Sequence, residues 1–345
     1  MKKKIRNLML MSVLFGVMIF TITGCGGNDN KASEGSVNIT LYHGYSTAET
    51  DNPGNYLATQ FVKYINEAAS DKIKIKIVGD GLGGDDLELL DGVMNGTTDM
   101  MISYTDDMGM NQPSLLMPSI PFLFNTDEEV YKYLDSDAFQ GEVKKYDKTY
   151  KTHTLGLAAG GFREMINNKH EIKTVSDLGD LKFRIPQDDL YKSVYEALGA
   201  NAVPISGDEM FSALQQHTVD GQCMTIDGIV AYGYKDIVKY MSMTNHMYTT
   251  YTLVMSADLY NSLTPELQTI IDEASEKAIK DQRQMVINTT EDAIQEIKDS
   301  GVKVSTGVDI DSFRNAVEGV WKTYRKKFGT EFWDNSLSFI ESNRQ

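Results

Sequence analysis

Apolar residues in this chain alternate between a period of two and a period near four, and this alternation limits the fold more than any other feature. Val37 to His43 alternates apolar and polar residues, and Asn55 to Ser70 carries one apolar stripe at spacing four. Ile73 to Val78 and Leu87 to Met94 repeat the strand and helix patterns, and a third strand is expected over Met100 to Ile102. Strands that alternate with helices form parallel sheets, so the chain is predicted to be an α/β protein.

A second run of the same kind follows later in the chain. Strand patterns occur at Thr154 to Ala158, Asp180 to Ile185 and Ala202 to Pro204, with helix patterns at Asp189 to Leu198 and Asp208 to Gln216. Two such runs within about 310 residues indicate two domains.

One predicted helix is unusually long. Thr264 to Lys298 keeps helical apolar spacing, and Pro265 marks its first turn. Glu273 and Lys277 form a spacing-four ion pair on its polar side. A helix of this length is long enough to span two lobes.

The first 24 residues have the organisation of a lipoprotein signal peptide. Four basic residues precede the apolar run Leu8 to Ile22, which is short for a membrane span. Two small residues then precede Cys25, which we expect to be the first mature residue and to carry the acyl chains of a membrane anchor. The alternative is an uncleaved signal anchor. Residues 25–35, rich in Gly, Asn, Asp and Ser, are predicted to be a flexible tether.

Charge and cysteine content exclude several classes of protein. Without the four basic residues of the signal, 29 basic residues remain against 49 acidic ones, a net charge near −20. Such a polyanion does not bind nucleic acid by neutralising phosphates, and an anionic ligand must be held by local cations. Cys223 is the one cysteine after Cys25, so no intramolecular disulfide is expected and Cys223 is predicted to be a buried free thiol.

The motifs of common enzymes are missing or misplaced. Gly79 to Gly84 satisfies G-x-G-x-x-G, but Asp85 and Asp86 at the following helix start would repel a pyrophosphate. The segment also follows the second strand, whereas the dinucleotide fingerprint follows the first, so it is predicted to be a turn. The chain has no H-E-x-x-H, G-x-S-x-G or Walker pattern, and its five histidines are scattered. No catalytic residue, cofactor or metal is therefore predicted.

Two arginines are the informative cations. Arg163 follows a Gly-Gly-Phe segment at a predicted strand end, and Arg184 lies in a strand between Phe183 and Ile185, on the opposite face from both. A guanidinium can hold a carboxylate in a bidentate pair, which makes both arginines candidate anion ligands. Taken alone, such an arginine would more often lie on a solvated face or form a structural salt bridge.

Several short motifs follow one another in a fixed order. They are Leu82 to Asp99, Gly161-Phe162-Arg163, Leu181 to Pro186, Ala197 to Ala200, Val219 to Gln222 and Thr244 to His246. In this order they resemble the DctP-type solute receptors of the tripartite ATP-independent periplasmic (TRAP) transporters.

This resemblance implies a two-lobed α/β fold of the periplasmic-binding-protein, type II-like kind, with a long helix backing both lobes. Lobe I is expected to comprise residues 36–160 with about 247–288. Lobe II is expected to comprise residues 161–246 with about 289–345.

The resemblance also implies which residues hold the ligand. Arg184 occupies the position of the arginine that forms the principal salt bridge to the ligand carboxylate, and Arg163 that of an assisting arginine. Further cleft positions are matched by Tyr45, Ser46, Tyr104 and Asp86.

Two departures from the family pattern affect the expected substrate. Where the family has Glu-Asn-Pro after Asp-Gly-Gln, this chain has Cys223-Met224-Thr225, and Met224 cannot donate the hydrogen bond of an asparagine. An aromatic cleft residue is also replaced near Gly207, so Met224 and Gly207 are counted among the ligand-binding positions. We expect the pocket to take a bulkier or more apolar body behind the same carboxylate.

The sequence therefore predicts an extracytoplasmic solute-binding lipoprotein, anchored through Cys25 and periplasmic if the cell has two membranes. It would deliver a small organic carboxylate (a dicarboxylate, sugar acid or related acid) to the membrane subunits of a TRAP permease. We expect a monomer with no nucleic-acid partner. A sensory receptor for a membrane kinase and an extracytoplasmic enzyme remain as alternatives.

Overall fold

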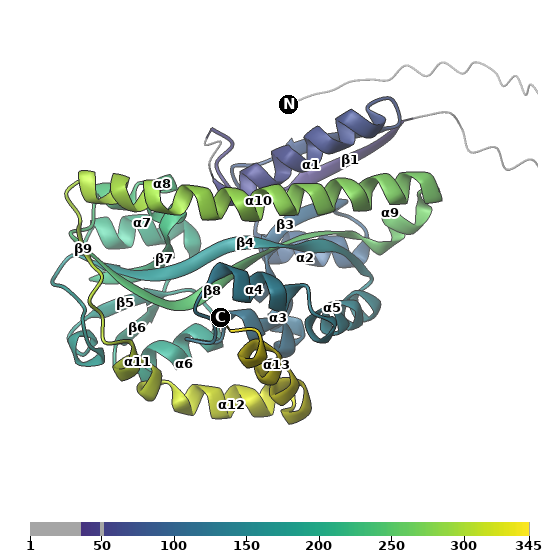
Figure 1. Ribbon diagram of the computed structural model, residues 1–345. Helices are drawn as coiled ribbons and strands as arrows, with labels where there is room; N and C mark the ends of the chain where they lie inside the picture. The colour runs from purple at the N-terminus through teal and green to yellow at the C-terminus, as the bar shows by residue number, and fades with distance from the viewer. Residues whose placement is uncertain (1–35, 49–51, 345) are drawn as a thin grey trace, which may run out of the picture. The chain divides into compact units, whose positions relative to one another are not determined.

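The strands of the described residues form one mixed sheet, which organises the fold (Figure 1). The computed structural model describes residues 36–48 and 52–344, so the predicted signal peptide (1–24), Cys25 and the tether (25–35) lie outside it. The strands are β1 (Val37–Tyr42), β2 (Ile73–Val78), β3 (Met100–Tyr104), β4 (Thr152–Asn167), β5 (Lys182–Ile185), β6 (Asn201–Pro204), β7 (Gly221–Thr225), β8 (Tyr240–Ser256) and β9 (Lys303–Ser305). They are ordered β2-β1-β3-β8-β4-β7-β5-β6, and β9 pairs with β8.

Helices connect the strands and cover the sheet. They are α1 (Pro53–Ala69), α2 (Asp86–Asn95), α3 (Thr105–Asn111), α4 (Asp127–Leu134), α5 (Asp137–Tyr150), α6 (Asp189–Ala197), α7 (Gly207–Gln215), α8 (Ile226–Ala231), α9 (Ala257–Ser262), α10 (Pro265–Asp299), α11 (Ile310–Ala316), α12 (Glu318–Phe328) and α13 (Thr330–Ser342). Short 3-10 segments are η1 (Pro113–Ser119), η2 (Val175–Leu178) and η3 (Tyr234–Asp236). None of the helices in the described part of the chain has the length and apolarity that a membrane span requires.

Two groups of parallel strands lie at opposite ends of the sheet. β1 pairs in parallel with β2 and β3, and β5 pairs in parallel with β6 and β7. Between the groups lie β8 and β4, which have 17 and 16 residues and pair antiparallel. The predicted α/β class is confirmed, and the two long strands make the sheet mixed because each pairs antiparallel with its neighbouring group.

β4 is longer than the sequence pattern predicted, and this corrects the position of Arg163. A strand was expected over Thr154 to Ala158 with Arg163 at a strand end, whereas Arg163 lies within β4. Gly161 has a φ of 93°, and the register of β4 against β8 shifts between Ala159 and Gly161. The glycines therefore form a β-bulge, which bends a strand without ending it.

α10 lies against elements of both parallel groups. Its 35 residues begin after Thr264, whose side chain accepts a hydrogen bond from the Leu267 amide, and Pro265 fits the first turn because that position needs no N–H donor. α10 packs against α1, β4, α8 and β9 (Figure 1). The predicted long helix that backs both groups of strands is therefore confirmed.

The apolar core consists of three clusters. One joins α1 and the first three strands to the first half of α10, for example through Phe61 and Ile271. A second joins β7 and α8 to the end of α10, for example through Ile229 and Ile297. The third gathers residues of α4, α5, α6, α12 and α13. The C-terminal helices contact helices that follow both groups of parallel strands. α12 packs against α6, which follows β5, and α13 packs against α4 and α5, which follow β3. The boundaries of the two lobes stay a prediction.

The amide of Gln282 connects α10 to the bent part of β4. Gln282 is fully buried, accepts a hydrogen bond from the Ala159 backbone N–H at 2.9 Å and donates to the Ala159 carbonyl at 2.6 Å. Replacing Gln282 by Ala leaves both backbone groups of Ala159 buried without a partner. We expect Gln282→Ala to lower the free energy of unfolding in urea by about 2–4 kcal/mol.

The exposed Gln284 on the same helix offers the matched control for this prediction. Gln284→Ala should change the free energy of unfolding by less than about 0.5 kcal/mol. Equal stability of the two variants would contradict a structural role for the Gln282 amide.

Candidate functional site

Arg184 is a buried cation whose terminal nitrogens are unoccupied. Phe183 and Ile185 on either side of it are fully buried, and Arg184 itself is only 6% exposed. Its Nε donates to the Ile205 carbonyl at 2.9 Å, and it forms no other hydrogen bond or ion pair with the described residues. Burial lowers the pKa of Arg184, and the nearby positive charge of Arg163 also lowers it. The guanidinium therefore lies in a poorly solvated place where an anion would stabilise it.

Arg163 lies close to Arg184 but is held by three bonds. Its Nε donates to the sulfur of Cys223 at 3.2 Å, and one terminal nitrogen donates to the Cys223 carbonyl at 2.9 Å. The other donates to the hydroxyl of Thr249 at 3.0 Å, and the guanidinium lies 5.3 Å from the centre of the Tyr191 ring. Burial alone would lower the pKa of Arg163, but the charge of Cys223 raises it well above its ordinary value.

Tyrosines from the first group of strands approach these arginines. Tyr45 is buried after β1, and its ring lies edge-on to Tyr104 at 6.2 Å and to Tyr251 at 5.0 Å. Burial raises the pKa of Tyr104 to about 12, and the charge of Arg163 opposes that rise. The charge of Asp86, at the start of α2, acts on both Tyr45 and Tyr104. The structure thus brings together Tyr45, Tyr104, Asp86 and the arginines.

Two partly buried acids were not identified from the sequence. Asp106 and Asp107 lie in the first turn of α3, directly after Tyr104. Burial raises the pKa of Asp106 to about 7 and that of Asp107 to about 6. Asp106 accepts a hydrogen bond from Ser119 at 2.6 Å, and the charge of Arg163 lowers the pKa of Asp106. The sequence signal that could have identified them is a pair of adjacent acids shortly after a predicted strand.

Gln222 is a third residue that sequence reasoning did not select. It is fully buried on β7, in register with Arg184 on β5, and its side chain makes no hydrogen bond of ordinary geometry with the described residues. The buried Tyr234 hydroxyl lies close to the Gln222 side chain, and it likewise makes no hydrogen bond of ordinary geometry within the described residues. Buried polar groups are nearly always satisfied, so this part of the molecule is prepared for a polar partner. Gln222 belongs to the Asp-Gly-Gln motif, which was the signal that could have identified it.

The remaining predicted positions are less closely connected to the arginines. Met224 is buried on β7 in an apolar cluster with Ile229, and Ser46 is partly exposed after Tyr45. Gly207 begins α7 in an exposed position, and no atom lies within 4 Å of the place where a β-carbon would stand. No contact joins Ser46 or Gly207 to either arginine in the described part of the chain.

Two expectations about unused motifs agree with the structure. Residues 80–83 of the G-x-G-x-x-G segment form a turn, and the side chain of Asp85 caps α2 by accepting from the Leu87 and Glu88 amides. Cys223 is a buried free thiol. Within the described residues no cluster of three or more His, Cys, Asp or Glu could hold a metal ion.

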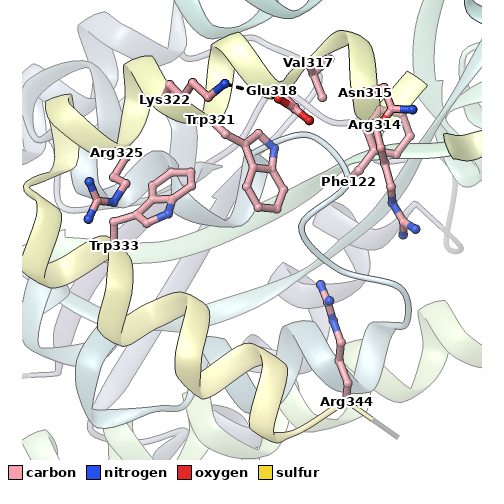
Figure 2. A pocket seen from close by; sticks show the side chains of 10 residues that line it. All are labelled: Phe122, Arg314, Asn315, Val317, Glu318, Trp321, Lys322, Arg325, Trp333 and Arg344. Carbon is pink, nitrogen blue, oxygen red and sulfur yellow. Dashed lines mark hydrogen bonds and ion pairs between the residues drawn. The ribbon is translucent and has the colours of Figure 1, made fainter. Parts of the chain in front are cut away.

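A cavity of about 480 Å³ lies elsewhere, beside the C-terminal helices (Figure 2). Phe122, Trp321 and Trp333 line it together with several cations, and it contains none of the predicted ligand-binding residues. Its cations already have partners: Arg325 forms two bonds to Asp334, and Lys322 pairs with Glu318. Arg314 and Arg344 likewise donate to Asn125 and to the Leu123 carbonyl. The aromatic rings make much of the lining of this cavity apolar, and each of its cations is bonded or paired with a described residue.

Comparison with known proteins gives one family. Residues 43–327 match the DctP model, described as bacterial extracellular solute-binding protein, family 7. The chain is 26% identical over 278 residues to the 2,3-diketo-L-gulonate-binding periplasmic protein YiaO of Escherichia coli K12, covering 81% of this chain and 84% of that protein.

Solved structures agree with this match. The sugar acid binding protein DctPAm from Advenella mimigardefordensis, in complex with galactonate, is 25% identical with a TM-score of 0.83, covering 89% of this chain and 98% of that one. A TRAP periplasmic solute binding protein from Polaromonas sp. JS666, bound to D-erythronate, is 27% identical with a TM-score of 0.81, covering 88% and 98%.

The partly buried acid Asp106 makes a testable contribution to the pH dependence of stability. Its pKa of about 7 exceeds the ordinary value of 3.8, so the folded protein binds this proton more tightly than the unfolded chain. The free energy of unfolding should therefore fall as the pH rises from about 4 to about 7. In the unmodified protein, Asp106 should lower the free energy of unfolding by up to ~4 kcal/mol over this range, and in Asp106→Asn this contribution should be absent. Urea unfolding at a series of pH values measures the difference.

The exposed Asp71 supplies the control, and Asp71→Asn should leave the pH profile parallel to that of the unmodified protein. If Asp106→Asn also gives a parallel profile, Asp106 is ionised at low pH in the folded state and the assignment is wrong.

Proposed function

The chain belongs to the DctP family of bacterial extracellular solute-binding proteins, family 7, and from this premise we propose that it captures a small organic carboxylate for a TRAP membrane permease. In this proposal the protein binds and releases its solute without chemical turnover. Capture takes place outside the cell, and the acylated Cys25 keeps the protein at the membrane surface where the permease subunits lie.

The unoccupied guanidinium of Arg184 is the observation that carries the proposal. Arginine has five N–H donors, and Arg184 uses only the one on Nε. Its terminal nitrogens form a planar fork that matches the two oxygens of a carboxylate. Arg184 is also buried, so a carboxylate bound there would interact with it under little screening by water. We assign Arg184 as the principal carboxylate anchor.

Arg163 is assigned a supporting role in holding the carboxylate, because it is also a buried guanidinium with unused N–H donors. Three of its donors are engaged by Cys223 and Thr249, which leaves two N–H groups for the ligand. These bonds fix the orientation of the Arg163 guanidinium, which supplies a second positive charge beside Arg184. Gln222 is in register with Arg184 and makes no hydrogen bond of ordinary geometry within the described residues, so it is assigned as a further donor or acceptor for the ligand.

The groups opposite the arginines favour a hydroxylated body behind the carboxylate. Asp106 and Asp107 can accept hydrogen bonds from ligand hydroxyls, and the rings of Tyr45, Tyr104 and Tyr251 supply flat apolar surfaces. Relatives bound to D-erythronate and galactonate hold acids of this type. We therefore propose a sugar acid or a related hydroxy acid as the ligand, with Met224 and Asp86 shaping the rest of the pocket.

Closure of two lobes over the ligand completes the proposal. Arg163 and Arg184 come from β4 and β5, whereas Tyr45 and Tyr104 follow β1 and end β3. A ligand that contacts both sides binds the closed form more tightly and so shifts the population toward it. The lobes have the boundaries given above, with lobe I at 36–160 and about 247–288, and the protein acts as a monomer.

Calorimetry on Arg184 variants tests the carboxylate anchor. With D-erythronate or galactonate as the ligand, Arg184→Ala should weaken binding by about 2–5 kcal/mol because the ligand carboxylate loses its charged partner. Arg184→Lys should recover only part of the affinity, because an ammonium keeps the charge but lacks the fork. Arg314→Ala is the matched control, since Arg314 is exposed on α11.

Unchanged affinity in Arg184→Ala would overturn the assignment of this residue.

A thermal-shift screen tests the ligand class. We expect sugar acids to raise the melting temperature of the full chain in a concentration-dependent way, because a ligand that binds only the folded state stabilises it. The corresponding neutral sugar alcohols should give no shift, since they lack the carboxylate for Arg184. Equal shifts from an acid and its neutral alcohol would argue against a carboxylate site.

A further inference from the structure

The sulfur of Cys223 occupies the place that a counter-ion of Arg163 would take. The Nε of Arg163 donates to it at 3.2 Å. Cys223 is 1% exposed and Arg163 is 8% exposed. A terminal nitrogen of Arg163 also bonds to the Cys223 carbonyl, which fixes the guanidinium against β7. No carboxylate forms an ion pair with Arg163 among the described residues. Among the described residues, the sulfur is therefore the one potentially negative group in direct contact with the guanidinium of Arg163.

The surroundings of the sulfur favour its negative form. Tyr195 and His246 lie beside it, and they are joined to each other by a hydrogen bond of 2.9 Å. Burial alone would raise the pKa of Cys223, but the charge of Arg163 and the contacts with His246 and Tyr195 lower it. A thiol next to cations and donors is commonly a thiolate at neutral pH.

The other charged groups nearby do not reverse this balance. Burial raises the pKa of Glu164 to about 8, so this acid is largely neutral at pH 7. The positive charge of Arg184 favours a thiolate as well. The titratable groups that face the sulfur are Arg163 and Glu164 from β4, Arg184 from β5, Tyr191 and Tyr195 from α6, and His246 from β8.

We propose that Cys223 determines ligand specificity, because its sulfur is a built-in anion bonded directly to Arg163, whereas the terminal nitrogens of Arg184 keep their donors for a ligand carboxylate. The site then matches a ligand with a single carboxylate. A second carboxylate placed beside Arg163 would also lie beside the thiolate, and two like charges in a buried place repel. This inference rests on the proposed function and narrows its ligand class to monocarboxylates.

The charge on the sulfur can be measured without any ligand. Thiolates absorb in the ultraviolet where thiols do not, and the difference between the full chain and its Cys223→Ser variant isolates Cys223 from Cys25. We expect the thiolate signal at pH 7 and its loss only on acidification. In Arg163→Gln the same signal should be lost at a higher pH. A Cys223 that ionises only above about pH 8, like an ordinary thiol, would overturn the proposal.

The selectivity is tested with a matched pair of variants. Cys223→Asp keeps a negative charge at this position, and Cys223→Asn has nearly the same shape without the charge. Calorimetry would compare D-erythronate with tartrate, which has two carboxylates on a carbon chain of the same length. Relative to Cys223→Asp, the Cys223→Asn variant should shift the ratio of dissociation constants toward tartrate by about tenfold or more, the effect of one pKa unit of charge interaction.

Equal ratios in the two variants and in the unmodified protein would overturn the role of Cys223 in selectivity. Circular dichroism would establish that both variants are folded, and if either is not, the absorbance titration of the unmodified protein still decides the state of the sulfur. Failure of the unmodified protein to bind either acid would refute the proposed function and the selectivity with it, whereas the absorbance result would stand independently.

Discussion

A buried positive charge without a counter-ion is the constraint on which the rest of this site depends. Arg184 is 6% exposed and donates one hydrogen bond, from Nε to a backbone carbonyl, so its terminal nitrogens have no hydrogen-bond partner within the described residues. Removing such a charge from water is costly unless an anion compensates it. The chain as a whole has a net charge of −16, so an anion can be attracted only by a local arrangement of buried cations. The fold places Arg163 and Arg184 close together in such an arrangement.

The long strands and the long helix explain how the arrangement is held. Arg163 lies in the middle of β4, next to a bulge at Gly161, and β4 pairs on one side with β8 and on the other with β7. α10 is joined to the same strand through the buried amide of Gln282. Because the groups on the two sides of the site are carried by different parallel strands, the closure proposed above would require the two long strands between them to bend.

Around the arginines the structure balances charge with buried groups that can give up or keep a proton. Asp106 and Glu164 have raised pKa values because they are buried, which reduces their negative charge near neutral pH. Cys223 has a lowered pKa because Arg163 lies against its sulfur. These opposite shifts leave the cationic character of the site concentrated at Arg184, which is the feature that a carboxylate ligand would recognise.

The sequence by itself determined the α/β class and the long helix and selected Arg184 as a candidate ligand, because periodicity and short motifs are local properties of the chain. It did not determine the length of β4, since the glycines that suggested an end form a bulge. Only the tertiary structure decided that the sulfur of Cys223 meets Arg163, a residue 60 positions away. It also decided that Asp106 is partly buried near Arg163. Such contacts depend on how strands far apart in the sequence pair, and no local pattern of residues carries that information.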